Sequence, residues 1–330
     1  MKACWYETTG PARDVLVLGE MPMPEPGPGE VRVRIAVSAV NPSDTKARCG
    51  WRGRPIAFPR IVPHQDGAGT IDKVGTGVAA RRVGERVWVY MAQRGRPFGT
   101  AAEYTVVPSK RAVTLPDSAS FEDGACLGIP AMTAHRCLYA DGDIAGQAIL
   151  VQGGAGAVGF YAVQLAKLGG ARAVIATVGR AETAARAREI GADAVVDYSK
   201  ENVVERVITL LKDKTPLDRV VEVAFGTNLA TDVALLRSGG VIATYSSDVV
   251  PDPVVPFTPM LMKDLTVRFV LIYEVPQGAR DHAARDINRL IAAGKLKHQI
   301  AEIFPLMRIA EAHERMEEGR AVGKLLIRLD

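Results

Sequence analysis

Residues 148–167, AILVQGGAGAVGFYAVQLAK, decide the fold of this chain. The apolar run at 148–152 predicts a buried strand, and apolar side chains after Gly159 recur at helical spacing. Between them, the glycines of a GxGxxG pattern permit a tight turn, close approach of the backbone to a pyrophosphate, and close packing of helix on strand. Free N–H groups at the helix N-terminus favour the anion. We therefore predict a dinucleotide-binding turn whose cofactor contacts are Gly154, Gly156, Ala157, Val158 and Gly159.

Further units of apolar strand and amphipathic helix follow this turn. Strands are expected at 173–178, 194–198, 218–223 and 240–245, with helix-like segments between them. Continuous apolar strands separated by about 10–15 residues of helix are typical of a parallel sheet buried on both faces. The pattern predicts an α/β domain with a doubly wound (Rossmann) sheet over residues 123–267.

The flanking segments have a different pattern. Short alternating strands are expected at 30–37, 86–90 and 103–107, and a short helix from Pro42 with Asn41 as its cap. After residue 268, two helices near 278–293 and 309–318 precede a closing strand, LLIRLD. We expect residues 1–122 and 268–330 to form one β-rich domain, into which the Rossmann domain is inserted.

Composition excludes several classes of protein. The 330 residues are 48% hydrophobic and 24% charged, as in compact globular proteins. The net charge of +4 is too small for the basic surface of a nucleic-acid or membrane binder, so no such partner is expected. The four cysteines form no metal or disulfide cluster, and neither a signal peptide nor a long apolar span is evident. We predict a cytoplasmic enzyme acting on a small molecule.

The end of the second strand bears on the choice of cofactor. An acidic residue at this place binds an unphosphorylated ribose, whereas a cation accepts a 2′-phosphate. The sequence is ATVGRAE, with Thr177, Gly179 and Arg180 but no acid before Glu182. This favours NADPH over NADH, although Arg180 could instead be a solvated residue at a helix start.

Several segments together resemble the medium-chain dehydrogenase/reductase superfamily. They are the β-rich N-terminus, Asn41-Pro42-Ser43-Asp44, PHQDGAGTIDKVGTGV (63–78), VGERVW (83–88), AEYTVVP (102–108), LVQGGAGAVGFYAVQLAK (150–167) and GKLLIRL (323–329). The chain is most similar to the zinc-free quinone oxidoreductase (zeta-crystallin-like) branch. This resemblance implies a GroES-like catalytic domain, a Rossmann domain, NADPH as cofactor, and a homodimer; the apolar segment 265–272 at the sheet edge is the expected dimer contact.

The resemblance also implies roles for individual residues. Arg180 and Tyr198 are expected at the 2′-phosphate, and Thr133 at the nicotinamide. Thr133, Tyr198 and Lys324 could instead have packing or surface roles. The other residues implied at the cofactor are Thr177, Gly179, Phe225, Ser246, Phe269, Val270, Leu271 and Lys324.

The zinc ligands of related dehydrogenases are absent from the sequence. Residues 41–44 contain no cysteine, Gln65 and Asp66 stand where a His-Glu pair is expected, and residues 86–108 contain no cysteine. His64 lies one place away, and a lone histidine is more often structural than a ligand. We predict no metal.

Few catalytic side chains are needed, because hydride transfer is the chemistry of the nicotinamide. Asn41 is the candidate donor to the substrate oxygen, or simply a helix cap, and Asp44 is a candidate to order the loop or a water. Lys46 and His64 are candidate proton donors. The predicted reaction is reduction of a quinone; reduction of an alkenal or enone, or a non-catalytic, crystallin-like NADPH-binding role, remain as alternatives.

Overall fold

The structure is a computed structural model that describes residues 1–211 and 216–329. The chain folds into two compact units. Unit 1 consists of Met1–Ile129 with Ala284–Asp330, and unit 2 of Pro130–Ala283.

Unit 2 contains a six-stranded sheet in the order β10-β9-β8-β11-β12-β13, in which every pairing is parallel. Numbered from β8, this order is 3-2-1-4-5-6, the doubly wound arrangement predicted from the sequence. The strands are β8 (Ala148–Val151), β9 (Ala173–Val178), β10 (Ala194–Asp197), β11 (Leu217–Glu222), β12 (Leu236–Thr244) and β13 (Thr266–Phe269).

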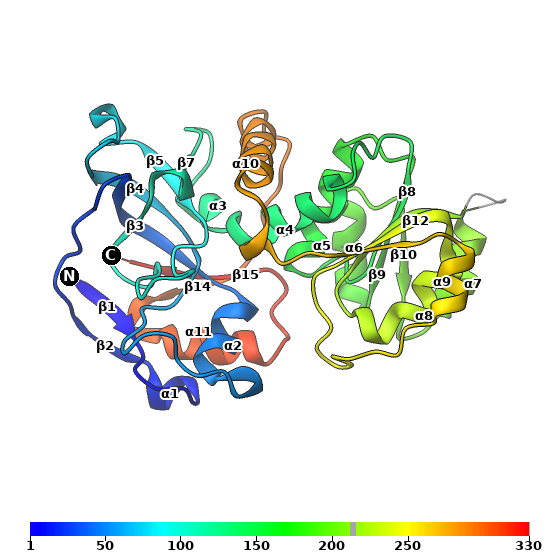
Figure 1. Ribbon diagram of the computed structural model, residues 1–330, viewed down its shortest axis with the longest axis horizontal. Helices are drawn as coiled ribbons and strands as arrows, with labels where there is room; N and C mark the ends of the chain where they lie inside the picture. The colour runs from blue at the N-terminus through cyan, green and yellow to red at the C-terminus, as the bar shows by residue number, and fades with distance from the viewer. Residues whose placement is uncertain (212–215, 330) are drawn as a thin grey trace. The chain divides into compact units, whose positions relative to one another are not determined.

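Helices precede, connect and follow the strands of unit 2, and those that come directly after β8, β9, β10 and β11 pack against the sheet (Figure 1). They are α4 (Gly128–Tyr139), α5 (Ala157–Leu168), α6 (Ala181–Glu189), α7 (Val203–Leu210), α8 (Phe225–Leu235), α9 (Phe257–Met262) and α10 (Gln277–Ala292), of which α4 and α10 run across the unit boundaries. The parallel sheet and its helices confirm the predicted α/β fold. The predicted domain boundaries, 122/123 and 267/268, remain a prediction.

Unit 1 is built around a seven-stranded sheet of mainly antiparallel pairs in the order β14-β15-β3-β4-β5-β7, with β6 also paired to β3. In Figure 1 the red C-terminal strand β15 lies beside the blue N-terminal strand β3, and the register pairs Leu325 with Val40. The strands are β3 (Glu30–Val40), β4 (Asp66–Val74), β5 (Arg86–Val89), β6 (Tyr104–Pro108), β7 (Ala112–Thr114), β14 (Ile300–Pro305) and β15 (Lys324–Arg328).

The remaining elements of unit 1 are short apart from two helices. A two-stranded sheet joins β1 to β2. The bounds of these elements are β1 (Lys2–Trp5), β2 (Val17–Glu20), α1 (Ala12–Val15), α2 (Pro42–Cys49), α3 (Phe121–Ala125), α11 (Ile309–Glu317), and the 3₁₀ turns η1 (Trp51–Gly53), η2 (Ala80–Arg82), η3 (Ser109–Arg111) and η5 (Leu306–Arg308). One further 3₁₀ turn, η4 (Ile272–Glu274), belongs to unit 2.

Three details differ from the sequence-based expectations. The strand expected at 265–272 covers only Thr266–Phe269 and is followed by η4, because an apolar run does not by itself separate strand from turn. Helix α8 begins at Phe225, ahead of the segment LATDVALLR (229–237), for which the sequence predicts a helix. The sequence analysis missed β14 and α9, in which most side chains are exposed, so neither has a clear buried period.

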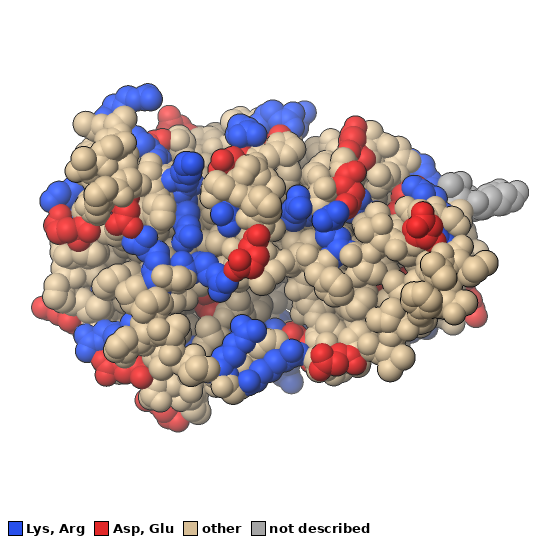
Figure 2. Space-filling view, in the orientation of Figure 1, with Lys and Arg blue, Asp and Glu red and all other residues tan. Residues whose placement is uncertain are grey.

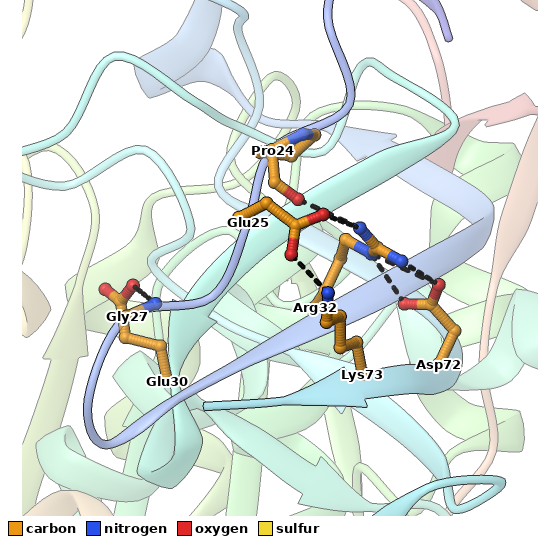
Figure 3. A network of polar contacts seen from close by, with 7 residues as sticks. All are labelled: Pro24, Glu25, Gly27, Glu30, Arg32, Asp72 and Lys73. Carbon is orange, nitrogen blue, oxygen red and sulfur yellow. Dashed lines mark hydrogen bonds and ion pairs between the residues drawn. The ribbon is translucent and has the colours of Figure 1, made fainter. Parts of the chain in front are cut away.

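A polar network fixes the proline-rich segment 21–29 onto the antiparallel pair of strands β3 and β4 (Figure 3). Arg32 of β3 donates to Asp72 of β4 (2.8 Å), to the carbonyl oxygen of Pro24 (3.2 Å) and to Glu25 (2.9 Å). At the far end of the same strand pair, Asp66 of β4 lies opposite Ala39 of β3. The network therefore supports the strands that lead to the polar cluster described below.

Within residues 1–211 and 216–329, none of the helices is both long and apolar enough to cross a membrane. Acidic and basic side chains are interspersed on the face shown in Figure 2.

Candidate functional site

The glycine turn connects β8 to α5. The N–H of Gly154 donates to the carbonyl of Thr177 (2.9 Å), and that of Gly156 to the carbonyl of Gly153 (2.9 Å). A Cβ at Gly159 would lie 2.2 Å from the Gly153 oxygen, so this glycine is required by the fold. A Cβ at Gly156 would meet only that same oxygen, at 3.3 Å, a contact far less severe than the one at Gly159. The turn therefore fits the pyrophosphate of a dinucleotide, with Ala157 and Val158 in the first turn of α5.

A chain of hydrogen bonds runs from this turn along the carboxyl ends of the strands. The N–H of Gly153 donates to Oγ1 of Thr177 (3.0 Å), whose hydroxyl donates to Oε1 of Gln152 (2.7 Å). Nε2 of Gln152 donates to Oδ1 of Asp232 in α8 (3.1 Å). Thr177 is 1% exposed, so it supports the turn from within the protein.

Asp232 and Glu222 form a buried acid pair at the end of this chain. The other oxygen of Asp232 faces no described donor, while Glu222 accepts from the N–H of Ala224 and from Nδ2 of Asn228 (3.1 Å). Two ionised carboxylates would both be acceptors. Burial, and then the charge of Glu222, raise the pKa of Asp232 well above its usual value. The proton that these shifts favour therefore belongs on Asp232, whose second oxygen can then donate it to Glu222.

The residues predicted for the 2′-phosphate lie near one another. A Cβ at Gly179 would lie 2.4 Å from the hydroxyl of Tyr198, so the tyrosine packs over this glycine. Tyr198 is 58% exposed, and Arg180 is the N-cap of α6 with its side chain 46% exposed and 3.4 Å from Glu182. The structure brings Gly179, Arg180 and Tyr198 together at the carboxyl ends of β9 and β10.

The other residues predicted at the cofactor differ in exposure. Thr133 and Val270 are buried, and Ser246 is half-buried with its carbonyl accepting from the N–H of Phe225 (3.1 Å). Phe225 is buried in the core of unit 2 and contacts Phe269 edge to face at 5.6 Å. Phe269 and Leu271 are 74% and 55% exposed. The roles of these residues remain predictions.

In unit 1, Asn41, Asp66 and Lys324 form one buried cluster. Nδ2 of Asn41 donates to Oδ2 of Asp66 (2.8 Å), and Oδ1 of Asn41 accepts from Nζ of Lys324, which also lies 3.5 Å from Asp66. The N–H of Ile129 donates to both oxygens of Asp66, each at 3.0 Å. The Asn41 amide therefore bridges an ammonium and a carboxylate. Lys324, predicted at the cofactor, thus lies against a residue predicted to be catalytic.

Asp44 lies one turn into α2, and its carboxylate accepts from the N–H of Asn41 (2.8 Å). This is the helix-capping arrangement, and Asn41 is the N-cap as predicted. Burial, and next the charge of Asp66, raise the pKa of Asp44 to about 7. Asp44 therefore titrates near neutral pH.

These residues do not fit a zinc site. Zinc ligands in this position would be thiolates, imidazoles or carboxylates at about 2.0–2.3 Å from one metal. The carboxylate of Asp66 instead binds an amide, a backbone N–H and an ammonium. The Lys324 ammonium is the positively charged partner of Asp66, and the Asn41 amide and the Ile129 N–H are its neutral hydrogen-bond donors.

His64 belongs to a separate buried chain in which each donor can be assigned. The Thr100 hydroxyl donates to the Asp66 carbonyl (2.6 Å), so Ser38 must donate to Thr100 (2.7 Å). Nδ1 of His64 then donates to Ser38 (2.8 Å), and Nε2 of His64 accepts from Nε2 of His313 (2.9 Å). His64 is therefore engaged on both nitrogens and is not a free proton donor in this arrangement.

Sequence reasoning missed the central residues of both clusters. In the sequence, Asp66 stands out only as a residue in place of a zinc ligand, and Gln152, Glu222 and Asp232 do not stand out at all. Glu222 within the apolar run DRVVEV was a usable signal, since a buried acid needs a partner. Gly128 gave no such signal, because its contact with Asp66, in which a Cβ would lie 2.0 Å from the carboxylate, is formed only in the folded chain.

Similarities to known proteins extend over both units of the chain. Residues 27–117 match the alcohol dehydrogenase GroES-like domain, and residues 190–327 match the zinc-binding dehydrogenase family. The quinone oxidoreductase of Homo sapiens is 30% identical over 88% of this chain and 86% of its own length. The NADPH-dependent alkenal/one oxidoreductase of Arabidopsis thaliana is 29% identical over 88% of this chain and 69% of its own length.

Two solved structures superpose over both whole chains. A mycobacterial protein complexed with NADPH is 26% identical, with a TM-score of 0.86 and coverage of 100% of each chain. An NAD-dependent alcohol dehydrogenase is 29% identical, with a TM-score of 0.87 and coverage of 100% of each chain. Together these comparisons support a nicotinamide cofactor.

Proposed function

Because the chain belongs to the quinone oxidoreductase (zeta-crystallin-like) branch of the medium-chain dehydrogenase/reductase superfamily, we propose that it reduces quinones, or similar conjugated carbonyl compounds, with NADPH and without zinc. The observation that carries the proposal is the buried contact of Lys324 with Asn41 and Asp66. This contact places the Lys324 ammonium beside Asp66, one of the two residues that stand where the His-Glu pair of zinc-dependent relatives is expected.

The bound nicotinamide supplies the hydride, and this chain's residues hold the reactants and stabilise charge. We propose that the glycine turn and the first turn of α5 hold the pyrophosphate, and that Arg180 and Tyr198 hold the 2′-phosphate. Hydride addition to a conjugated carbonyl places negative charge on its oxygen. Lys324 has three N–H groups, and Asn41 and Asp66 engage two of them. The third is the donor we propose for that oxygen.

A second candidate function is reduction of the double bond of alkenals or enones. It is favoured by the activity for which the Arabidopsis relative is named and by the tomato 2-methylene-furan-3-one reductase, which is 31% identical over 88% of this chain. The same charge stabilisation serves both reactions, because each places negative charge on a carbonyl oxygen. We also propose a homodimer and a cytoplasmic location.

Initial rates of NADPH oxidation with quinones, enones and simple aldehydes, each with and without a metal chelator, test the proposal. We expect quinone-dependent oxidation that survives the chelator, and tight binding without oxidation would favour the crystallin-like alternative. Lys324→Met should lower kcat with little change in the dissociation constant of NADPH, whereas Lys167→Met, at an exposed ion pair in unit 2, should change neither. Activity that requires one bound zinc per chain would contradict the proposal.

A further inference from the structure

The segment that follows Asp44 carries unusual charge. Residues 46–60, KARCGWRGRPIAFPR, contain five cationic side chains and no acidic one. Arg48 binds Glu317 and the carbonyl of Gly10, and Arg60 binds Glu7 (2.6 Å), so these two cations are engaged within the protein. Arg52 and Arg54 are exposed and have no ion-pair partner among residues 1–211 and 216–329.

Trp51 gathers two of these cations around one aromatic ring. Nζ of Lys46, on α2, lies 4.9 Å from the centroid of the Trp51 ring, and the guanidinium carbon of Arg52 lies 4.2 Å from it. Trp51 is half-buried, and Arg52 is exposed. Cations at these distances are attracted to the ring, so the cluster of Lys46, Trp51 and Arg52 holds positive charge beside a flat apolar surface.

The backbone of this cluster is strained at Arg52. Gly50, Arg52 and Gly53 have φ values of 72°, 57° and 68°, in the left-handed region. Glycine adopts this region freely, but arginine does so at a cost, and such residues concentrate at binding sites. The strained backbone places the Arg52 guanidinium over Trp51 instead of leaving it extended into solvent.

We propose that the cluster of Lys46, Trp51 and Arg52 binds a carboxylate attached to the planar conjugated carbonyl compound that the enzyme reduces. This inference rests on the proposed function and adds the substrate class to it. With the Arg52 guanidinium over the Trp51 ring, its edge N–H groups remain able to take both oxygens of a carboxylate, and Lys46 adds a second cation beside the same ring. Lys46 is two residues beyond Asp44 on α2, which links the cluster to the helix that begins at Asn41.

A matched pair of substrates tests this inference. One is a naphthoquinone with a propanoate side chain, and the other is its methyl ester; the saturated linker keeps the two rings electronically alike. We expect kcat/KM for the acid to exceed that for the ester by about tenfold at low salt, and this preference to fall at about 0.5 M salt through screening. Arg52→Gln and Lys46→Met should each lower the ratio several-fold. Arg60→Gln, in the same segment but paired to Glu7, is the control that should keep it.

Equilibrium binding separates this inference from the proposed function. Quenching of Trp51 fluorescence, with Trp51→Phe as the blank, reports binding of either compound without turnover. Preferential binding of the acid, lost in Arg52→Gln, would support the inference even if neither quinone were reduced, a result that would overturn only the proposed reaction. Equal binding and equal kcat/KM for acid and ester, with quinone reduction intact, would overturn the inference alone.

Discussion

Arg180 is the residue on which the choice between NADPH and NADH depends. In the structure its guanidinium is partly exposed and lies 3.4 Å from Glu182, an ion pair of small energetic value. A 2′-phosphate is a stronger partner, because its hydrogen bonds with a guanidinium are charge-assisted.

We expect Arg180→Ala to raise the Michaelis constant for NADPH about tenfold and to leave that for NADH nearly unchanged, since a charge-assisted bond contributes about 1.5–3 kcal/mol. Tyr198→Ala should give a smaller shift in the same direction. Steady-state kinetics with both cofactors at low salt measure the effect. Equal weakening of both cofactors would mean that Arg180 is only a helix-start residue.

The His64 and His313 pair makes stability depend on pH in a predictable direction. Burial, and next the influence of His313, hold the pKa of His64 well below its usual value, and burial, with Arg48, lowers that of His313 to about 3. In the unfolded chain both return to about 6.5. As the pH falls below about 6.5, the unfolded chain binds protons that the folded chain does not, so the free energy of unfolding falls.

His313→Gln keeps a donor toward His64 and removes one of these protons. We therefore expect the free energy of unfolding to fall less steeply between about pH 6.5 and pH 4 in this variant, by up to about 1.4 kcal/mol per pH unit. Asp44, whose pKa is raised, acts in the opposite direction but is present in both proteins and cancels in the comparison. Urea denaturation at a series of pH values gives the slopes, and identical slopes would contradict the assignment of His313 as neutral.

At the scale of elements, the β8–α5 turn separates a binding glycine from a folding glycine. Gly156 has φ of −75°, and a Cβ there would lie 3.3 Å from the Gly153 oxygen, a tight contact that a shift of a few tenths of an ångström relieves. Gly159 has no such room, because its Cβ would lie 2.2 Å from the Gly153 oxygen.

Gly156→Val should therefore abolish detectable NADPH binding with a small change in Tm, because its side chain fills the space that the pyrophosphate needs. Gly159→Val should lower Tm by several degrees, since a backbone clash of this size forces the helix away from the strand. Calorimetric titration and thermal unfolding compare the two. Unchanged affinity in Gly156→Val would place the phosphate elsewhere.

The polar chain from Gly153 to Glu222 connects the turn that follows β8 with the end of β11, at the carboxyl ends of the strands. We expect Asp232 to hold the proton of the acid pair, because burial and the charge of Glu222 raise its pKa, and Asp232→Asn can then reproduce both of its contacts. Asp232→Leu leaves Gln152 and Glu222 unpaired, at a cost of about 1–3 kcal/mol for each buried group.

We expect Asp232→Asn to keep NADPH affinity within about twofold, and Asp232→Leu to weaken it by about tenfold or more as Gln152 and Thr177 lose their positions. Affinity is measured by fluorescence titration of NADPH alongside Tm. A comparable loss of affinity in both variants would show that Asp232 is ionised and acts through its charge.

At the scale of the whole molecule, unit 2 exposes a large amount of apolar surface in one segment. Val249, Val254, Phe257, Met262 and Phe269 are 82%, 94%, 69%, 76% and 74% exposed. The last of these lies on β13, the edge strand of the parallel sheet. Unpaired edges and exposed apolar patches of this kind are usually covered by a partner.

We expect a homodimer through this segment at micromolar concentration. Val254→Asp and Phe269→Glu should shift the mass toward the monomer in light scattering, since each places a charge in a desolvated contact. Ile208→Asp, which alters an exposed apolar residue on α7, should leave the mass of the dimer unchanged. A monomeric wild-type protein would contradict the prediction.

The sequence by itself determined the elements that have a local cause. The strands of unit 2 and their order of appearance could be predicted from apolar runs and helical periods. The glycine turn could be predicted from three glycines between a strand and a helix. The same holds for α2, whose cap and N3 acid, Asn41 and Asp44, are three residues apart. In each case the residues that cooperate are neighbours along the chain.

Only the tertiary structure decided which polar residues cooperate across the chain. Lys324 meets Asn41, 283 positions away, because β15 pairs antiparallel with β3 and places Leu325 opposite Val40. Asp66 joins them because β4 pairs with the other side of β3. Folding raises the pKa of Asp232 because it buries this carboxyl group against Glu222. Sheet register and burial set these partners and charge states, and neither is encoded in the spacing of residues along the sequence.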